Sequence, residues 1–404
     1  MTRQALHNIK VFELATAATG PMMGKFLADF GATVVRVESA TFTDIGRTAP
    51  PFKDYKVGLN RSGFFCITNN NKYGVTLNLN NAKAIEIAKR FILWCDIYIE
   101  NFRPGVVARW GLDYDSVKKI KPTIIMLSTC MQGQTGPRAS FPGFGGQLVS
   151  LTGFTHLTGW PDRSPVRPFQ AYTDVIGPRF GTGALISALI YRNRTGKGQY
   201  FDLSQYETGL HFLSPLILDY AVNGRVANRM GNRCPYAAPH GAYPCKEQDS
   251  WCVITVFTDS QWRSLCQIMG EPSWAKEEKF ATLLARKQNE EELDGLIGEW
   301  TINFNANEVM SRLQNIGVPA GVVKDAQEMF SDPQLAHRGH FKELEHPEIG
   351  KQSYYDQGFR LSKTPSNINR AAPCQGEHNE YVYTQILGMS DEEFVELLAE
   401  GVFD

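Results

Sequence analysis

Residues 9–38 read IKVFELATAATGPMMGKFLADFGATVVRVE, and they set the architecture that we expect for most of the chain. The two ends of this stretch, residues 9–15 and 32–38, are short and rich in β-branched residues, which is typical of strands. Between them a helical pattern begins at Pro21 and stops before Gly31, and proline near the start with glycine after the end is the usual asymmetry of a helix. The stretch therefore predicts a β-α-β unit.

The same alternation of strands and helices continues beyond this unit. The patterns predict strands over 75–79, 96–100, 123–129 and 199–204, and helices over 81–94, 105–120 and about 180–191. Alternating strands and helices favour a parallel sheet that is covered by helices on both faces. We therefore expect an α/β protein with a Rossmann-like parallel sheet.

The middle of the chain has a different composition. Residues 141–169 are rich in glycine, proline, threonine and aromatic residues, which is typical of a long ordered loop that carries function. Residues 223–244 also read as a loop. Strand-like runs at 250–257 and 318–323, with helical patterns between them, predict a second, smaller α/β part.

Composition and charge argue against several classes of function. The 404 residues include 41 lysines and arginines against 42 aspartates and glutamates, a net charge of −1, so nucleic acid is not expected as a partner. The sequence contains no run of about 18 apolar residues, and we expect a cytoplasmic protein without a membrane partner. The eight cysteines include no Cys-x-x-Cys pair, which predicts neither a zinc site nor a disulfide framework.

The common cofactor signatures are missing from the sequence. No Gly-x-Gly-x-x-Gly follows a predicted strand, and Gly196-Lys197-Gly198 lacks the rest of a phosphate-binding loop. We therefore expect neither a nicotinamide nor a flavin cofactor. His337, His340 and His346 lack the spacing of a helical metal site, and we interpret them as surface histidines rather than as metal ligands.

One acidic residue stands between the aromatic loop and an apolar helix. It is Asp174, in the sequence Tyr172-Thr173-Asp174-Val175-Ile176-Gly177. A carboxylate with an ordinary pKa of about 4 is ionised at neutral pH, so it can attack an acyl centre without a neighbouring base. An aspartate in this place is also typical of a helix N-cap or a turn. The residues alone favour that structural role and leave the catalytic one open.

Eight short motifs occur in a fixed order between residues 19 and 379. They are Thr19-Gly20-Pro21 with the helix into Gly31–Glu38, Asn71–Leu79, Glu100–Gly105, Gly133–Pro137, Thr195–Gln199, Arg229–Asn232, Asp332–Gln334 leading to Arg338-Gly339, and Gly376–Asn379. Each motif is modest evidence by itself. Together, and in this order, they resemble the class III (CaiB/BaiF-type, formyl-CoA transferase-like) CoA-transferase family.

The resemblance implies a mechanism and an architecture. Asp174 matches the family's nucleophile, which attacks an acyl-CoA thioester to give an aspartyl anhydride and then an aspartyl-CoA thioester. Coenzyme A is then a substrate, with an acyl-CoA donor and a carboxylic-acid acceptor as partners. Relatives have a large Rossmann-like domain, here 1–220 with 330–404, and a small α/β domain, here 221–329. Two such chains interlock like rings, so we expect a homodimer, although some relatives pair unlike subunits.

The resemblance also implies positions for contacts with CoA. The residues expected near adenine and the phosphates are Leu77, Asn101, Phe102 and Arg109, with the further cations Arg36, Lys72 and Arg103. For Arg36 and Lys72 a solvated surface charge is an equal alternative. The positions that match the thiol end of CoA are Ala18 and the segment Cys130–Gly133, which includes Gln132.

Two departures from the relatives bear on function. Phe144-Gly145 stands where the related α-methylacyl-CoA racemases have a His-Asp pair, so an acyl-CoA racemase or isomerase is a disfavoured alternative. Val256–Asp259 follows a predicted strand directly, without the glycine-rich flap of some relatives, so we do not expect glycine shielding of the anhydride. A non-catalytic CoA-binding subunit is the other alternative, and Asp174 argues against it.

Polar and aromatic residues surround Asp174 in the sequence. The candidates for substrate binding are His156, Tyr172 and Arg179, together with Trp160, Arg163 and Arg167. Such residues suit an acid with a second carboxylate or an aromatic ring, and residues 158–162 resemble a branch that acts on aryl or branched dicarboxylic acids. Equally open is a structural role, with Trp160 as a loop anchor and the arginines paired with Asp162.

Overall fold

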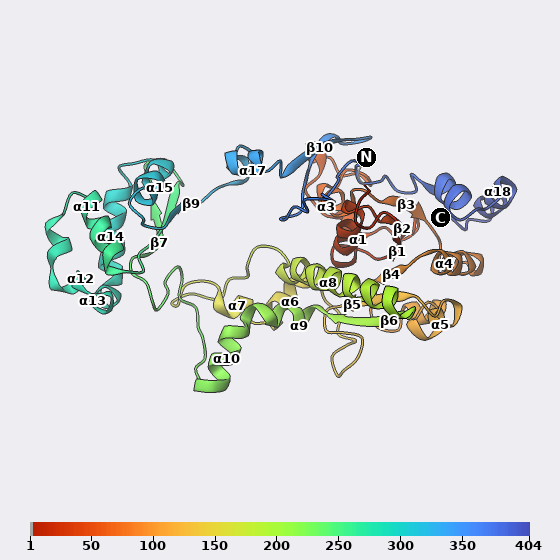
Figure 1. The fold of residues 1–404 in the computed structure, drawn as a ribbon, viewed down its shortest axis with the longest axis horizontal. Coiled ribbons are helices and arrows are strands. Elements are labelled where there is room, and N and C mark those ends of the chain that lie inside the picture. Colours follow the sequence, from red (N-terminus) through yellow and green to blue (C-terminus); the bar gives the residue numbers. More distant parts are fainter. Residues whose placement is uncertain (1–2) are drawn as a thin grey trace. The chain divides into compact units, whose positions relative to one another are not determined.

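The computed structural model describes residues 3–404, and the chain divides into two compact units (Figure 1). The larger unit holds the chain up to Thr155, together with Arg167–Val226 and Gln334–Asp404. The smaller unit holds His156–Val166 and Ala227–Pro333. The expected domains were 1–220 with 330–404 and 221–329, whereas the two units meet at 226/227 and 333/334.

The segment His156–Val166 departs from the expected division, because we placed it in the larger domain. In the structure it packs within the smaller unit, where the backbone N–H of Gly231 donates to the carbonyl of Gly159 at 2.9 Å. The ring of Trp160 covers Gly231 so closely that a side chain at residue 231 would clash with it. These contacts join segments about seventy residues apart, and the composition of the loop does not reveal them.

The larger unit is built on a sheet of six parallel strands in the order β3-β2-β1-β4-β5-β6. The strands are β1 (Lys10–Leu14), β2 (Thr33–Glu38), β3 (Tyr73–Thr76), β4 (Ile97–Glu100), β5 (Ile125–Cys130) and β6 (Gln199–Ser204). This is the strand order of a doubly wound Rossmann-type sheet. The predicted parallel α/β sheet is confirmed.

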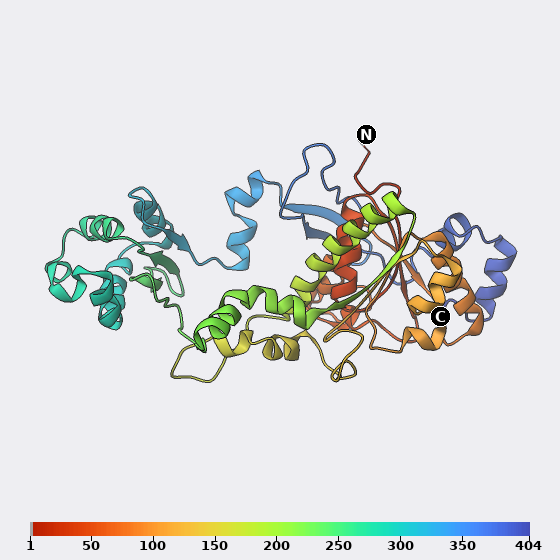
Figure 2. The ribbon, with the colours of Figure 1, turned by 60° about the horizontal axis from the view of Figure 1, so that its bottom comes forward.

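Helices cover both faces of this sheet. On one face lie α1 (Thr19–Asp29) and α8 (Tyr172–Thr195), and on the other lie α4 (Ala82–Trp94), α5 (Tyr114–Ile120) and α18 (Asp391–Ala399) (Figure 2). Successive residues of a strand point to opposite faces. Val11 accordingly packs in the core beneath α1 and α8, whereas Phe12 packs beneath α4.

Shorter elements complete the larger unit. They are α2 (Ile45–Thr48), η1 (Lys53–Tyr55), α3 (Gly63–Asn69), η2 (Val107–Trp110), α6 (Gly145–Leu151), α9 (Gln205–Leu210), η3 (His211–Leu213), α10 (Ser214–Asn223), η5 (Tyr381–Ile386) and the hairpin β10 (Phe341–His346) with β11 (Gly350–Tyr355). Two further helices, α7 (Phe154–Leu157) and α17 (Pro333–His337), contain residues of both units. Helices α6 and α7 lie in the stretch 141–169, which the sequence predicted to be a loop.

The smaller unit is an antiparallel sheet of three strands in the order β7-β8-β9, packed against helices. Its elements are β7 (His240–Pro244), β8 (Trp251–Thr255), β9 (Ala320–Val322), α11 (Asp259–Ile268), η4 (Ser273–Lys276), α12 (Glu278–Ala281), α13 (Leu283–Gln288), α14 (Glu290–Thr301), α15 (Ala306–Gln314) and α16 (Ala326–Phe330). The expected small α/β part is present. The loop predicted over 223–244 is wrong at its end, because β7 pairs with β8 although its sequence is poor in β-branched residues.

Helix α8 begins earlier than the sequence predicted. We expected a helix from about residue 180, but α8 begins at Tyr172 and contains Pro178. Proline removes a helical hydrogen bond, so the sequence pattern favours a start after it. The longer helix places Asp174 in its first turn rather than in the preceding loop.

Two glycines of α8 make a matched pair for testing how this helix packs on α1. A Cβ at Gly181 would clash with the sulfur of Met23 and lie 3.0 Å from Leu203, whereas Gly183 has nothing within 4 Å. We expect Gly181→Ala to lower the free energy of unfolding by about 1–3 kcal/mol through overpacking. We expect Gly183→Ala to raise it by about 0.5–1 kcal/mol, because alanine favours a helix. Urea unfolding measures both, and equal effects would contradict the close packing.

Candidate functional site

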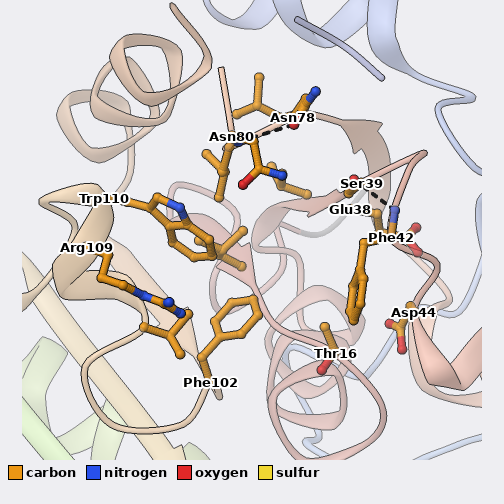
Figure 3. Close-up of a pocket in the computed structure, with 15 residues that line it drawn as sticks. Thr16, Glu38, Ser39, Phe42, Asp44, Asn78, Asn80, Phe102, Arg109 and Trp110 are labelled. Atoms are coloured by element: carbon orange, nitrogen blue, oxygen red, sulfur yellow. Dashed lines mark hydrogen bonds between the residues drawn. The ribbon is translucent and has the colours of Figure 1, made fainter. Parts of the chain in front are cut away.

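A pocket of about 380 Å³ opens at the carboxyl ends of β1 and β4 (Figure 3). After β1 the chain passes to α1 on one face of the sheet, and after β4 it passes to η2 and α5 on the other face. The two connections therefore diverge between neighbouring strands. Such a switch point leaves a crevice, and in doubly wound sheets ligands bind there.

Two side chains hold the loop that follows β1. The side-chain amide of Asn101, just after β4, accepts from the backbone N–H of Thr16 and donates to the Thr16 carbonyl, both at 2.8 Å. The carboxylate of Asp44 accepts from the backbone N–H of Ala17 at 2.8 Å. Ala17 has a φ of 58°, in the left-handed region, which a residue with a Cβ keeps only when its surroundings hold it. The crevice is therefore formed in advance of any ligand.

Aromatic side chains line opposite sides of the pocket. Phe102 and Trp110 lie on one side with ring centroids 5.6 Å apart, and Phe42 lies on the other (Figure 3). Phe42 is 78% exposed, an arrangement that leaves its ring free to stack on a flat partner. Leu77 adds apolar surface, and Arg109 supplies a cation to the same pocket. The lining fits a flat ring that carries negative charge nearby.

The structure brings together three of the predicted CoA contacts. Leu77, Phe102 and Arg109 all line the pocket. Asn101 lies next to Phe102, but its side-chain amide is hydrogen-bonded to the loop after β1. Ala18 is the N-cap residue of α1 and is buried.

Three other predicted contacts lie outside this pocket. Arg103 is exposed and donates to the carbonyl of Ser140 at 3.1 Å. Cys130 ends β5, its thiol donates to the carbonyl of Gly133 at 3.0 Å, and burial raises its pKa to about 11. Gln132 follows in the next turn, and its buried side-chain nitrogen has no hydrogen-bond partner among residues 3–404.

The structure corrects the prediction that Arg36 and Lys72 contact CoA. Both side chains are fully buried. Arg36 pairs with Glu13 at 3.0 Å and also with Asp44. Lys72 pairs with Glu13 at 2.9 Å and donates to the carbonyl of Pro21 at 2.7 Å. A buried charge is tolerated only when it is paired and hydrogen-bonded, so these cations serve the interior and are not available to a phosphate.

Glu38 occupies the position at the end of β2 where dinucleotide-binding folds hold a ribose with an acid. Arg47 takes both of its oxygens, with hydrogen bonds of 2.8 and 2.7 Å. Arg47 therefore engages both oxygens of the Glu38 carboxylate, which also lines the pocket.

The second feature of the site is the carboxylate of Asp174, which packs against Gly145 at the start of α6. A Cβ on Gly145 would lie 2.5 Å from one Asp174 oxygen and 2.5 Å from the Cβ of Ala171. Burial raises the pKa of Asp174 to about 6, and no partner among residues 3–404 opposes this effect. A desolvated carboxylate without a partner is a candidate nucleophile or base.

Contacts within the larger unit connect this carboxylate with the crevice. The loop after β1 leads into α1, where the hydroxyl of Thr19 accepts from the side chain of Gln205 at 3.1 Å. A Cβ at Gly177, one turn after Asp174 in α8, would lie 3.4 Å from Gln205 and 3.6 Å from Thr19. The crevice and Asp174 are thus joined through the N-terminal turns of α1 and α8.

Of the predicted substrate residues, Tyr172 lies in the same helical turn as Asp174. Its ring is in edge-to-face contact with Phe154, at 5.2 Å between centroids, and with Phe212, at 5.9 Å. Side chains two residues apart on a helix do not face each other, so Tyr172 belongs to an aromatic cluster of the larger unit rather than to the surroundings of the carboxylate.

Two more of the predicted substrate residues have different surroundings. Arg179 donates to the carbonyl of Val175 in its own helix. His156 belongs to the smaller unit and shares a hydrogen bond of 3.2 Å with Asn228. Neither forms a described contact with Asp174.

Sequence reasoning missed Phe42, Trp110 and Gly145 as site residues. Phe42 and Trp110 follow strand ends by four and ten residues, and an exposed aromatic residue after a strand of a doubly wound sheet is a usable signal. Gly145 acts through the side chain that it lacks, so one sequence offers no positive signal for it.

Histidines do not form a metal site in the described chain. Among residues 3–404 no group of three or more His, Cys, Asp or Glu side chains is placed to hold a metal ion. His346 was expected at the surface but is buried in the turn of the β10-β11 hairpin, where its ring accepts from the backbone N–H of Glu348 at 3.2 Å. No helix within residues 3–404 is long and apolar enough to cross a membrane.

Solved structures and curated proteins share this fold over nearly the whole chain. A CaiB/BaiF family protein from Brucella suis matches with a TM-score of 0.87 and 31% identity, over 95% of this chain and 100% of that one. The chain is 34% identical to a succinyl-CoA–D-citramalate CoA-transferase of Chloroflexus aurantiacus, over 98% of each chain. It is 32% identical to a succinate–glutarate CoA-transferase of Agrobacterium fabrum, over 94% of this chain and 95% of that one. Residues 6–379 match the profile of CoA-transferase family III. The chain belongs to CoA-transferase family III, and it is an enzyme.

The burial of Asp174 predicts a pH-dependent loss of stability. Its pKa is about 6 in the folded protein and about 4 in an unfolded chain. The folded state therefore holds the proton more tightly than the unfolded chain. The ionisation of Asp174 lowers the free energy of unfolding fully above about pH 6 and not at all below about pH 4. We expect Asp174→Asn to raise the free energy of unfolding by about 1–3 kcal/mol at neutral pH, with a smaller gain in acid. Urea unfolding across this range measures the difference, and a gain that is independent of pH would contradict burial as its cause.

Proposed function

We propose that this enzyme moves CoA from an acyl-CoA donor to a dicarboxylic acid by way of Asp174. The observation that carries the proposal is the partly buried carboxylate of Asp174, which has no hydrogen-bond or ion-pair partner among residues 3–404 and lies in the unit that also holds the crevice. Membership of family III supports CoA transfer as the reaction. The two relatives named above act, by their names, on citramalate, succinate and glutarate. Each of these acids has two carboxylates, and this supports the substrate class.

The reaction proceeds through two covalent states of Asp174. An Asp174 oxygen attacks the thioester carbonyl, the C–S bond breaks, and CoA leaves as a thiolate, which gives an aspartyl anhydride. The thiolate then attacks the Asp174 carbonyl and releases the donor acid, which leaves an aspartyl-CoA thioester. The acceptor carboxylate attacks this thioester, and the two steps run in reverse. No general base is needed, because both attacking carboxylates are already ionised.

The crevice between β1 and β4 is the site that we propose for the adenine end of CoA. The ring would stack between Phe42 on one side and Phe102 with Trp110 on the other. Arg109 would donate to the phosphates, for which a guanidinium offers paired N–H groups. The loop held by Asn101 leads from this pocket into α1. The first turn of α1 lies against the turn of α8 that follows Asp174, and this supports Asp174 as the reacting end of the same site.

The exposed apolar face of α10 supports an assembly of two chains. None of the residues of α10 is buried, and Leu218 and Tyr220 are 63% and 61% exposed. An apolar face of this kind marks an interaction surface. We propose a second copy of the chain as its partner, and light scattering of the purified protein tests this. A chain that is monomeric alone would favour pairing with an unlike subunit instead.

Labelling of Asp174 tests the proposed mechanism. After incubation with a panel of acyl-CoAs that includes succinyl-CoA, we expect intact-protein mass spectrometry to show a CoA adduct that maps to Asp174. Asp174→Asn should bind CoA but form no adduct, whereas Asp162→Asn, at an exposed aspartate, should react like the wild type. The labelling rate should fall as the pH drops below about 6, because a protonated carboxyl is a poor nucleophile.

Two outcomes would contradict the mechanism. An adduct on the Asp174→Asn variant would exclude this residue as the nucleophile. A wild-type chain that binds CoA but is labelled by none of the acyl-CoAs would favour the non-catalytic subunit.

Removing one aromatic wall tests the adenine pocket. We expect Phe42→Ala to weaken CoA binding about tenfold through lost stacking, without loss of stability because the ring is 78% exposed. Phe169→Ala is a matched control, since Phe169 is 88% exposed and lies outside the pocket lining. Isothermal titration with CoA measures both affinities. Equal affinities of the two variants would place the adenine elsewhere.

A further inference from the structure

Two adjacent glycines at the start of α6 each contact one charged side chain. The carboxylate of Asp174 packs against Gly145, and the guanidinium of Arg167 packs against Gly146, where a Cβ would lie 2.5 Å from the Arg167 Nη1. We propose that Arg167 binds the second carboxylate of a dicarboxylic acid while the first carboxylate reacts at Asp174. This inference rests on the proposed function and names the residue that selects its substrate class.

Arg167 is available to a ligand. Its side chain is exposed, and it takes part in no hydrogen bond or ion pair of the described chain, residues 3–404. Other arginines near the site are already engaged, because Arg179 donates to the carbonyl of Val175 and Arg103 donates to that of Ser140. A guanidinium without a partner can hold a carboxylate through two parallel N–H···O bonds.

The spacing suits a short dicarboxylic acid. Consecutive Cα atoms are about 3.8 Å apart, and each charged group packs directly against one of the two glycines. Asp174 and Arg167 are therefore close enough for one small molecule to reach both, yet they form no ion pair with each other. One carboxylate of such an acid can lie at the reacting centre while the other lies at Arg167.

Gly146 contributes by leaving this space open. A side chain at residue 146 would push the Arg167 guanidinium away from the start of α6. A cation at this point also offsets the repulsion between Asp174 and a doubly charged acid, since opposite charges attract strongly near a desolvated site. A monocarboxylic acid gains less, because its only carboxylate is the reacting one.

The test compares two acceptor acids of equal chain length, glutarate and pentanoate, with the same acyl-CoA donor. The ratio of their kcat/KM values cancels any effect on the donor. We expect Arg167→Gln to lower this ratio about 10- to 100-fold, mainly through KM for glutarate. Arg167→Lys keeps the charge without the fork and should have an intermediate ratio. Arg194→Gln, at an exposed arginine in the last turn of α8, should leave the ratio unchanged.

Labelling with acyl-CoA separates the two ways in which this test can fail. If the wild-type enzyme forms no adduct at Asp174, the proposed function fails. If the wild type is labelled but Arg167→Gln changes the two acids equally, or neither of them, the role of Arg167 is refuted. A labelled wild-type enzyme that prefers pentanoate to glutarate also refutes it.

Discussion

The pairing of Arg36 with two buried carboxylates keeps the ligand crevice in shape. Its guanidinium reaches from β2 to Glu13 in β1 and to Asp44 in the loop after β2. Because a buried cation is stable only with such partners, the pairing fixes the position of Asp44. Asp44 in turn holds the backbone of Ala17 in a left-handed conformation. The loop over the switch point is therefore ordered before a ligand arrives, and binding is spared an ordering entropy of about 1–2 kcal/mol per residue.

The sequence predicts the features that depend on neighbouring residues. It does not predict the features that depend on contacts between distant segments of the chain. The parallel sheet follows from short β-branched runs with helix signals between them, and the structure confirms it. The predicted roles of Arg36 and Lys72 were wrong. The sequence pattern around a cation near a strand is the same whether its side chain is exposed to water or, as here, is paired with Glu13. The start of α8 was misplaced, since Pro178 resembles a boundary when the packing around it is unknown. Phe42 was missed, because the pocket that it lines is formed by the loop after β2 together with the loop after β4, which is distant in the sequence.

The surroundings of Asp174 balance ionisation against reactivity. A cation in contact with the carboxylate would lower its pKa and also reduce its nucleophilicity. Full burial in apolar surroundings would raise the pKa beyond neutrality and leave the group protonated. A pKa of about 6, raised by burial, leaves the carboxylate ionised at neutral pH but poorly solvated. The stability lost to this burial is typical of functional sites, where activity and stability compete.

In the proposed reaction, the net charge beside the Gly145-Gly146 pair changes from one step to the next. While Asp174 is free, an acid with two carboxylates meets a third negative charge at the reacting centre. Once Asp174 carries CoA as a thioester its charge is gone, and Arg167 is then the nearest charge that the start of α6 presents to the acceptor. In the proposed reaction, the acceptor would therefore bind best to the covalent intermediate. When the product thioester forms and Asp174 regains its charge, the remaining carboxylate of the product again faces a mixed field of Arg167 and Asp174. If the proposed reaction holds, the packing of both groups on these two glycines favours the entry of the acid and the release of its thioester.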